Sequence, residues 1–306
     1  MQTLFPTKPS PATVVLLAAS VLLAVIGIGG VASGAADDDS DQPERAATVD
    51  TDDTTTTSLL ETGATTTLLS SATTAKATGT TVKKPTATTS ATPSGECTST
   101  PASANPGAEQ PPAIGTFTYV SCTDPNESTD IKIAEGQSGG GVTRREITVS
   151  EGGFMATTTT AFGAAGIIQE KLTIKANGLN LECDWNPDIV EFPADLSIGK
   201  SWSADSKCTT APPYSITIHA TGTRRISDRV AIKIAGTSVN AWVVNMTLKL
   251  DFSGPSFSGG FNETGVSFFD PTRGLGLYDK STFEGYGAFQ SEPMTTERHI
   301  KSLTPS

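Results

Sequence analysis

The sequence has few of the residues on which metal sites and acid–base catalysis most often depend. It contains only two histidines, His219 and His299, among 306 residues. Its four cysteines are Cys97, Cys122, Cys183 and Cys208. None belongs to a C-x-x-C pair or to a cysteine–histidine spacing typical of zinc ligands. We therefore expect no metal site and no cofactor.

Basic residues are also scarce. Residues 1–112 carry 5 Lys/Arg against 11 Asp/Glu, and the remaining residues carry 16 against 21. Affinity for nucleic acid depends largely on Lys and Arg side chains that displace phosphate counterions. Docking onto anionic lipid by charge needs the same residues. We therefore exclude nucleic acid as a partner and charge-driven docking onto lipid.

One long apolar run lies near the amino terminus, and no charged residue occurs between Ala12 and Ala36. About 20 apolar residues are enough to cross the hydrocarbon core of a bilayer. Lys8 precedes the run and three aspartates follow it, an asymmetry that places the carboxyl-terminal side outside. We predict a cytoplasmic tail (1–12) and a transmembrane helix (13–35) that anchors a single-pass cell-membrane protein. In the alternative, the run is a signal peptide cleaved at residues 33–36, and the chain is secreted.

The following segment has no aromatic residue. Residues 37–111 contain 21 threonines, many in runs. Such a composition cannot bury enough apolar surface to offset the entropy lost on folding. We predict a disordered, Thr-rich stalk over residues 36–111, of the kind that spaces a domain away from a membrane.

An even number of cysteines outside the cell indicates disulfide bonds. Three pairings are open, and both sequential pairs have a separation of 25 residues. We predict the pairs Cys97–Cys122 and Cys183–Cys208, each closing a loop worth about 3 kcal/mol in the chain-entropy account.

Residues 112–302 are dominated by period-two alternation. The clearest case runs from Trp242 to Phe252, where every second residue is apolar. Such alternation predicts a strand with one buried face. No stretch has ten residues of helical period. We predict an all-β extracytoplasmic domain built on an antiparallel curved sheet of eight or more strands, either a half-barrel or a sandwich.

Two motifs that resemble catalytic sites lack the necessary context. The G-x-S-x-G pattern around Ser138 lies between two predicted strands, whereas a nucleophile elbow needs a strand before it and a helix after it. Catalysis by histidine needs a nucleophile and an orienting acid. Neither His219, on a polar strand face, nor His299, in the carboxyl-terminal tail, has a recognisable partner. We predict no catalytic residues.

One acidic pattern matches a calcium-binding loop only in part. Asp184, Asn186 and Asp188 match the start of a calcium loop, but Ile189 replaces its glycine and Asp195 its glutamate. We interpret them as a turn.

Two arginine pairs, at 144–145 and 224–225, could in principle hold an anion. Successive strand residues face opposite ways, however, so neither pair can act as a clamp.

The stretch from Phe192 to Trp202, with its FP…L…G..W pattern, resembles a recurrent type of secreted bacterial all-β domain of uncharacterised function. The segments Gly115–Tyr119, Val239–Leu250 and Phe268–Leu277 extend the likeness. The resemblance implies a distant relation to half-barrel lipoprotein carriers, whose concave apolar sheet holds acyl chains beneath covering helices. This sequence shows no such helices.

From these features we expect a membrane-anchored, surface-displayed binding or interaction domain that is not an enzyme. Its partner would belong to the cell wall or cell surface. The alternative is a carrier or sensor of a lipid or other apolar ligand in a concave β-sheet.

Overall fold

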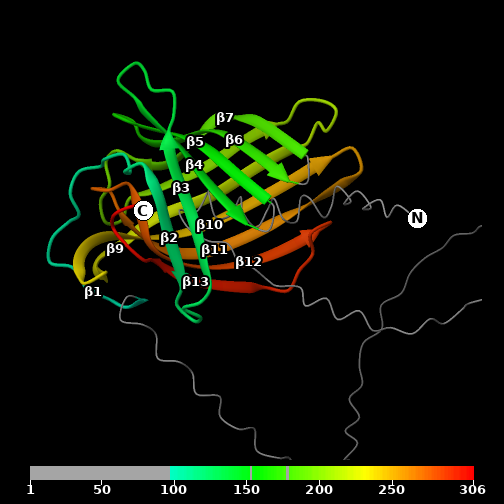
Figure 1. Cartoon of the computed structure of the whole chain (residues 1–306). Helices are drawn as coiled ribbons and strands as arrows, with labels where there is room; N and C mark the ends of the chain where they lie inside the picture. Colours follow the sequence, from blue (N-terminus) through cyan, green and yellow to red (C-terminus); the bar gives the residue numbers. More distant parts are fainter. Residues whose placement is uncertain (1–96, 152–153, 177–178) are drawn as a thin grey trace, which may run out of the picture. The chain divides into compact units, whose positions relative to one another are not determined.

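The computed structural model describes residues 97–306 except 152–153 and 177–178 (Figure 1). The predicted tail (1–12), transmembrane helix (13–35) and stalk up to residue 96 lie outside the described residues. Within the described ranges, no helix has the length and apolar character needed to cross a membrane. The strands are β1 (Ser99–Pro101), β2 (Gly115–Ser121), β3 (Ser128–Glu135), β4 (Thr143–Glu151), β5 (Phe154–Gly163), β6 (Gly166–Ala176), β7 (Leu179–Pro193), β8 (Ser201–Thr209), β9 (Thr217–Ile234), β10 (Thr237–Gly254), β11 (Phe257–Asp270), β12 (Leu275–Gly287) and β13 (Met294–Ile300).

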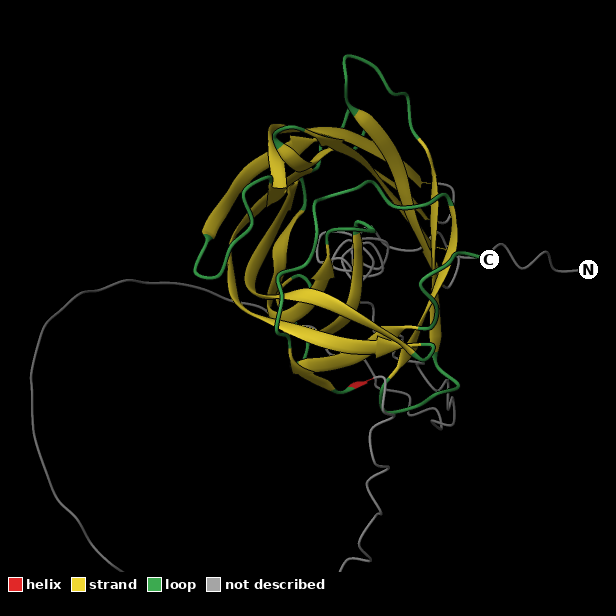
Figure 2. Ribbon diagram, turned by 90° about the vertical axis from the view of Figure 1, so that its left-hand side faces the viewer, coloured by secondary structure: helices red, strands yellow, loops and turns green. Residues whose placement is uncertain are grey.

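Strands β2 to β13 form a closed antiparallel barrel, seen as a ring of strands in Figure 2. Each strand pairs with the next in sequence, and β13 returns to pair with β2. The prediction of an all-β antiparallel sheet is confirmed, whereas the prediction of a half-barrel or a sandwich is wrong. Alternation reports which face of a strand is buried. It does not report whether the two ends of a sheet meet.

Alternate residues of each strand line the interior. On β10, Trp242 is 3% exposed and Leu250 is completely buried, as the alternation predicts. Aromatic rings gather towards both ends of the interior. Phe192 stacks on Phe269 with centroids 3.8 Å apart, and Phe261 stacks on Phe289 at 5.4 Å.

Two strand junctions have few ladder pairs. The β7–β8 seam has one, between Asn186 and Lys207. The β13–β2 seam has three, from Arg298 to Ile300. Every other pair of neighbouring barrel strands has at least five. The barrel therefore consists of two well-paired halves, β2–β7 and β8–β13, joined at two weaker seams.

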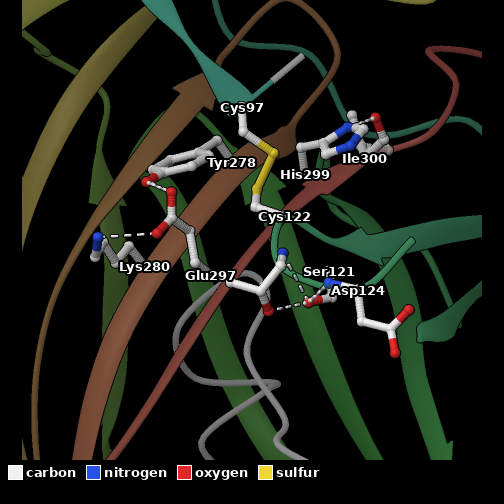
Figure 3. The surroundings of a disulfide bond; sticks show 10 residues. Cys97, Ser121, Cys122, Asp124, Tyr278, Lys280, Glu297, His299 and Ile300 are labelled. Carbon is white, nitrogen blue, oxygen red and sulfur yellow. Dashed lines mark hydrogen bonds and ion pairs between the residues drawn. A yellow bond between two sulfur atoms is a disulfide. The ribbon is translucent and has the colours of Figure 1, made fainter. Parts of the chain in front are cut away.

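A disulfide lies at each seam. Cys183 on β7 pairs with Cys208 on β8, with Cα atoms 5.4 Å apart. Cys97 pairs with Cys122, which follows β2, with Cα atoms 6.0 Å apart. The Cys122 amide donates to the carbonyl of Glu297 on β13 (2.8 Å), which places this bond beside the β13–β2 seam (Figure 3). The structure thus brings the cysteines into the two predicted pairs.

The segment before β2 lies on the barrel. Strand β1 pairs with residues 230–232 of β9, and the Arg229 side chain donates to the carbonyl of Ala102 (3.2 Å). Farther along, the Gln110 amide donates to the carbonyl of Pro271 (2.8 Å). Residues 97–111, which the composition assigned to the stalk, therefore belong to the ordered domain. That domain includes residues from Cys97 onward and does not start at residue 112.

Candidate functional site

The outer face of β4 to β7 forms an open groove of about 710 Å³, here called the β4–β7 groove. Its residues occupy the outward positions of their strands, because inward positions such as Ala156 and Thr158 are buried. Hydroxyl and amide groups line much of it, including those of Gln137, Ser138, Thr157, Thr159, Thr173 and Asn180. The Thr157 hydroxyl lies 2.9 Å from that of Thr148 on β4. The groove therefore presents many hydrogen-bonding groups on a rigid sheet.

Most charged groups in this groove have partners. Arg144 donates two hydrogen bonds to Glu170, at 2.7 and 2.8 Å. Lys171 forms an ion pair with Glu182. Because opposite charges alternate across the strands, the groove suits a ligand bound by hydrogen bonds better than a strongly charged ligand.

A second pocket, of about 410 Å³, lies at the β13–β2 seam and is here called the seam pocket. Successive residues of β13 line it, from Thr295 to Arg298. Since successive strand residues face opposite sides of a sheet, both the inner and the outer side of the wall contribute. The ladder between β13 and β2 stops at the pair of Arg298 and Ser121, so residues of β13 before Arg298 have no ladder partner on β2. The pocket therefore lies where the ladder pairing between the two strands ends, beside the hydrogen bond from the Cys122 amide to the Glu297 carbonyl.

The barrel interior contains charged and polar side chains between its aromatic ends. This polar belt consists of seven buried residues: Gln169, Glu191, Arg224, Glu263, Asp279, Ser281 and Arg298.

At the β7–β8 side of the belt, Glu191 and Arg224 form an ion pair at 2.8 Å. The Gln169 amide donates to Glu191 Oε1 (3.2 Å) and accepts a hydrogen bond from Trp185 Nε1 (2.8 Å). Burial raises the pKa of Glu191 to about 7, although Arg224 opposes this rise. This ion pair spans the weaker β7–β8 seam, since Glu191 lies on β7 and Arg224 on β9.

At the opposite side of the belt, Ser281 lies beside two buried acids. Its hydroxyl donates to Asp279 Oδ1 (3.2 Å), and it lowers the pKa of Glu263 as well as that of Asp279. Burial raises the pKa of Asp279 to about 8 and that of Glu263 well above its usual range. Arg298 lies directly opposite Asp279 in the ladder and lowers the pKa of both acids. Its guanidinium carbon is 5.9 Å from the centre of the Tyr119 ring.

The residues of the G-x-S-x-G pattern form a backbone-linked loop between β3 and β4. The Ser138 hydroxyl accepts a hydrogen bond from the Arg144 amide (3.1 Å) and donates to the carbonyl of Gly136 (3.4 Å). The histidines lie on β9 and β13, so the structure does not bring Ser138 and a histidine together as neighbours in the groove.

His219 lies on the polar face of a strand, as predicted, but the expectation that it has no partner was wrong, because its Nε2 lies 2.7 Å from Asp205 Oδ1 on the neighbouring strand β8. The interpretation of His299 was also wrong. His299 is not a tail residue. It is 4% exposed on β13, its Nδ1 lies 3.0 Å from the Ile300 carbonyl, and Figure 3 shows it near the Cys97–Cys122 bond.

The remaining sequence candidates lie on strands. Asp184, Asn186 and Asp188 are all within β7, so the predicted turn is wrong. The described part of the chain contains no group of three His, Cys, Asp or Glu residues placed to hold a metal ion.

The members of each arginine pair face opposite ways, as strand geometry predicts. Arg144 pairs with Glu170 in the groove, while Arg145 donates to the carbonyl of Pro112 (3.1 Å). Arg224 is buried in the belt and Arg225 is exposed.

Sequence reasoning missed the polar belt. Its signal was present in the alternation of β11, where Glu263 takes the inward position between Phe261 and Gly265. An acidic residue at an inward position of a barrel strand needs a partner or a proton.

Comparison of this chain with protein-family models, with curated proteins and with solved structures finds no match in any of the three.

Proposed function

We propose that the domain is an extracytoplasmic binding module that recognises a neutral, hydroxyl-rich polymer, such as a glycan strand, in the β4–β7 groove. The observation that carries the proposal is the lining of this groove, where hydroxyl and amide groups stand beside internally paired charges. A glycan offers donors and acceptors in similar numbers and carries no charge for these ion pairs to oppose. The predicted membrane anchor and stalk would hold this module at the cell surface.

The position of the groove supports display. The segment that leads from the predicted stalk is tied to the barrel by Cys97–Cys122 at the β13–β2 seam. In the strand order, β4 to β7 begin two strands beyond β2 and continue away from that seam. A partner could therefore reach the groove without contact with the point of attachment.

The alternative, a carrier of an apolar ligand, has less support. The interior of the closed barrel holds buried Glu191, Glu263, Asp279 and two arginines. Displacing their partners with an acyl chain would leave charged groups in an apolar environment, at a cost of several kcal/mol.

The proposal is tested by the binding of neutral oligosaccharides to the full-length chain with its disulfides formed. We expect Thr157→Val and Thr173→Val each to weaken binding, because each removes a hydroxyl from the groove and keeps a similar volume. Thr247→Val is a matched control. Thr247 also lies in a cross-strand threonine pair (2.9 Å from the Thr223 hydroxyl), but on β10, outside the groove. Equal binding by groove and control variants would refute the proposal, as would retention of an apolar ligand in the purified protein.

A further inference from the structure

The polar belt is short of one positive charge. It holds three carboxyl groups, of Glu191, Glu263 and Asp279, and two guanidinium groups, of Arg224 and Arg298. Glu191 and Arg224 neutralise each other at 2.8 Å. This leaves Glu263 and Asp279 with the single charge of Arg298. An uncompensated charge in a barrel interior is strongly unfavourable, so the belt needs one additional cation or proton.

Three oxygen atoms on neighbouring strands also need hydrogen-bond donors. Glu263 Oε2 on β11, Asp279 Oδ2 on β12 and Thr296 Oγ1 on β13 are buried, and no described residue hydrogen-bonds any of them. Ser281 hydrogen-bonds Asp279 and lies directly opposite Thr296 in the β12–β13 ladder, and both Ser281 and Asp279 act on the pKa of Glu263. The three oxygens therefore belong to one patch of the inner wall.

The seam pocket leads to this patch. Thr296 and Arg298 both line the pocket, and Arg298 also belongs to the belt. On the outer side the pocket is lined by Glu127, Glu297 and Lys280, and the last two form an ion pair at 2.8 Å. The pocket lining as a whole carries two acids, Glu127 and Glu297, and two bases, Lys280 and Arg298.

We propose that the seam pocket and the polar belt behind it bind a primary ammonium group, either as a small free amine or as the head of a larger ligand. An ammonium group supplies one positive charge and three N–H donors. It would therefore supply the missing charge and a donor for each of the three oxygens. This site is independent of the β4–β7 groove and of the glycan proposed there.

A proton fills the same role when no amine is bound. Burial holds the pKa of Glu263 well above its usual range and that of Asp279 near 8. The groups that face these acids are Arg224, Arg298 and Tyr119. Since the ammonium group replaces protons held by these acids, its binding releases protons below pH 8. Affinity then rises by up to tenfold for each pH unit in that range.

The test is calorimetric titration of the full-length, disulfide-bonded chain with ethylammonium chloride at pH 6 and pH 8. The titration is repeated in buffers of different ionisation enthalpy, because the change in observed enthalpy between buffers gives the number of protons released. We expect binding to be tighter at pH 8 by at least tenfold, with release of protons at pH 6. Tetramethylammonium, which has no N–H donor, and potassium should each bind at least tenfold more weakly.

Glu263→Gln is the informative variant, because glutamine resembles protonated glutamate and leaves the belt without a missing charge. We expect it to lose at least tenfold in amine affinity and to release no proton, while its melting temperature at pH 5 stays close to that of the parent chain. Asp205→Asn, which changes the same charge on the exposed outer face, should bind like the parent. The proposal is overturned by an absence of binding at both pH values, by equal binding of tetramethylammonium or potassium, or by unchanged affinity in Glu263→Gln.

Discussion

The buried acids should make the barrel lose stability as the pH rises through the neutral range. Asp279 is completely buried, and its pKa is about 8 in the folded state against roughly 3.9 in an unfolded chain. Below about pH 4 it is protonated in both states and has no differential effect. Between these two values only the folded state holds the proton, so the free energy of unfolding falls with pH by about 1.4 kcal/mol per unit.

Between pH 5 and pH 7, Asp279 alone should therefore lower the free energy of unfolding by about 3 kcal/mol. Glu263 acts in the same direction, because its pKa is also raised by burial. Above the folded pKa of each acid the loss is complete and the slope disappears. The sign is opposite to that of an ordinary surface carboxylate in an ion pair, whose stabilising effect is lost as the pH falls.

Urea unfolding of the full-length chain at pH 5, 6 and 7, followed by the fluorescence of its three tryptophans, measures this slope. Two of them, Trp185 and Trp242, are only 3% exposed and report on opening of the barrel. Asp279→Asn imitates the protonated acid. In this variant the decrease in the free energy of unfolding with pH should therefore be smaller than in the parent, by about 1.4 kcal/mol per pH unit. Asp130→Asn, at an exposed position of β3, should leave it unchanged. A parent chain that becomes more stable between pH 5 and pH 7, or an Asp279→Asn variant with the parental slope, would refute this reasoning.

Four further variants test the core and the seams. Trp242→Ala should lower the free energy of unfolding in urea by about 3–5 kcal/mol, because it leaves a cavity beside Phe269. A variant as stable as the parent would place the ring outside the core. Glu191→Ala should cost about 3–5 kcal/mol, since it leaves Arg224 buried without its partner. The double variant Glu191→Leu/Arg224→Met should recover much of that loss, and additive losses would show that the two residues do not interact. Replacing Cys183 and Cys208 by serine should lower the free energy of unfolding by about 3 kcal/mol and speed hydrogen exchange on β7 and β8. An exchange rate that rises equally on all strands would show that the disulfide does not protect that seam.

The alternation of apolar residues was sufficient to predict the strands and their buried faces. The stretch from Trp242 to Phe252 shows this most clearly, because its inward set is the one the pattern indicates. Closure of the barrel could not be predicted in the same way. It depends on three ladder pairs between β13 and β2, whose residues are far apart in the sequence.

The candidate sites were harder to predict, because their residues meet only across the sheet. His219 and Asp205 are neighbours through strand pairing, and their sequence spacing has no meaning outside that ladder. The β4–β7 groove likewise depends on outward residues of four strands. Glu263 is the exception, since its inward position on β11 was recognisable from alternation alone.

The most direct test of the proposed binding role is hydrogen–deuterium exchange of the full-length chain with and without neutral oligosaccharides. The account predicts slower exchange on β4 to β7, centred on the outward residues of the groove, with little change on β8 to β13. An unchanged exchange pattern at saturating oligosaccharide, or protection confined to strands outside the groove, would contradict it.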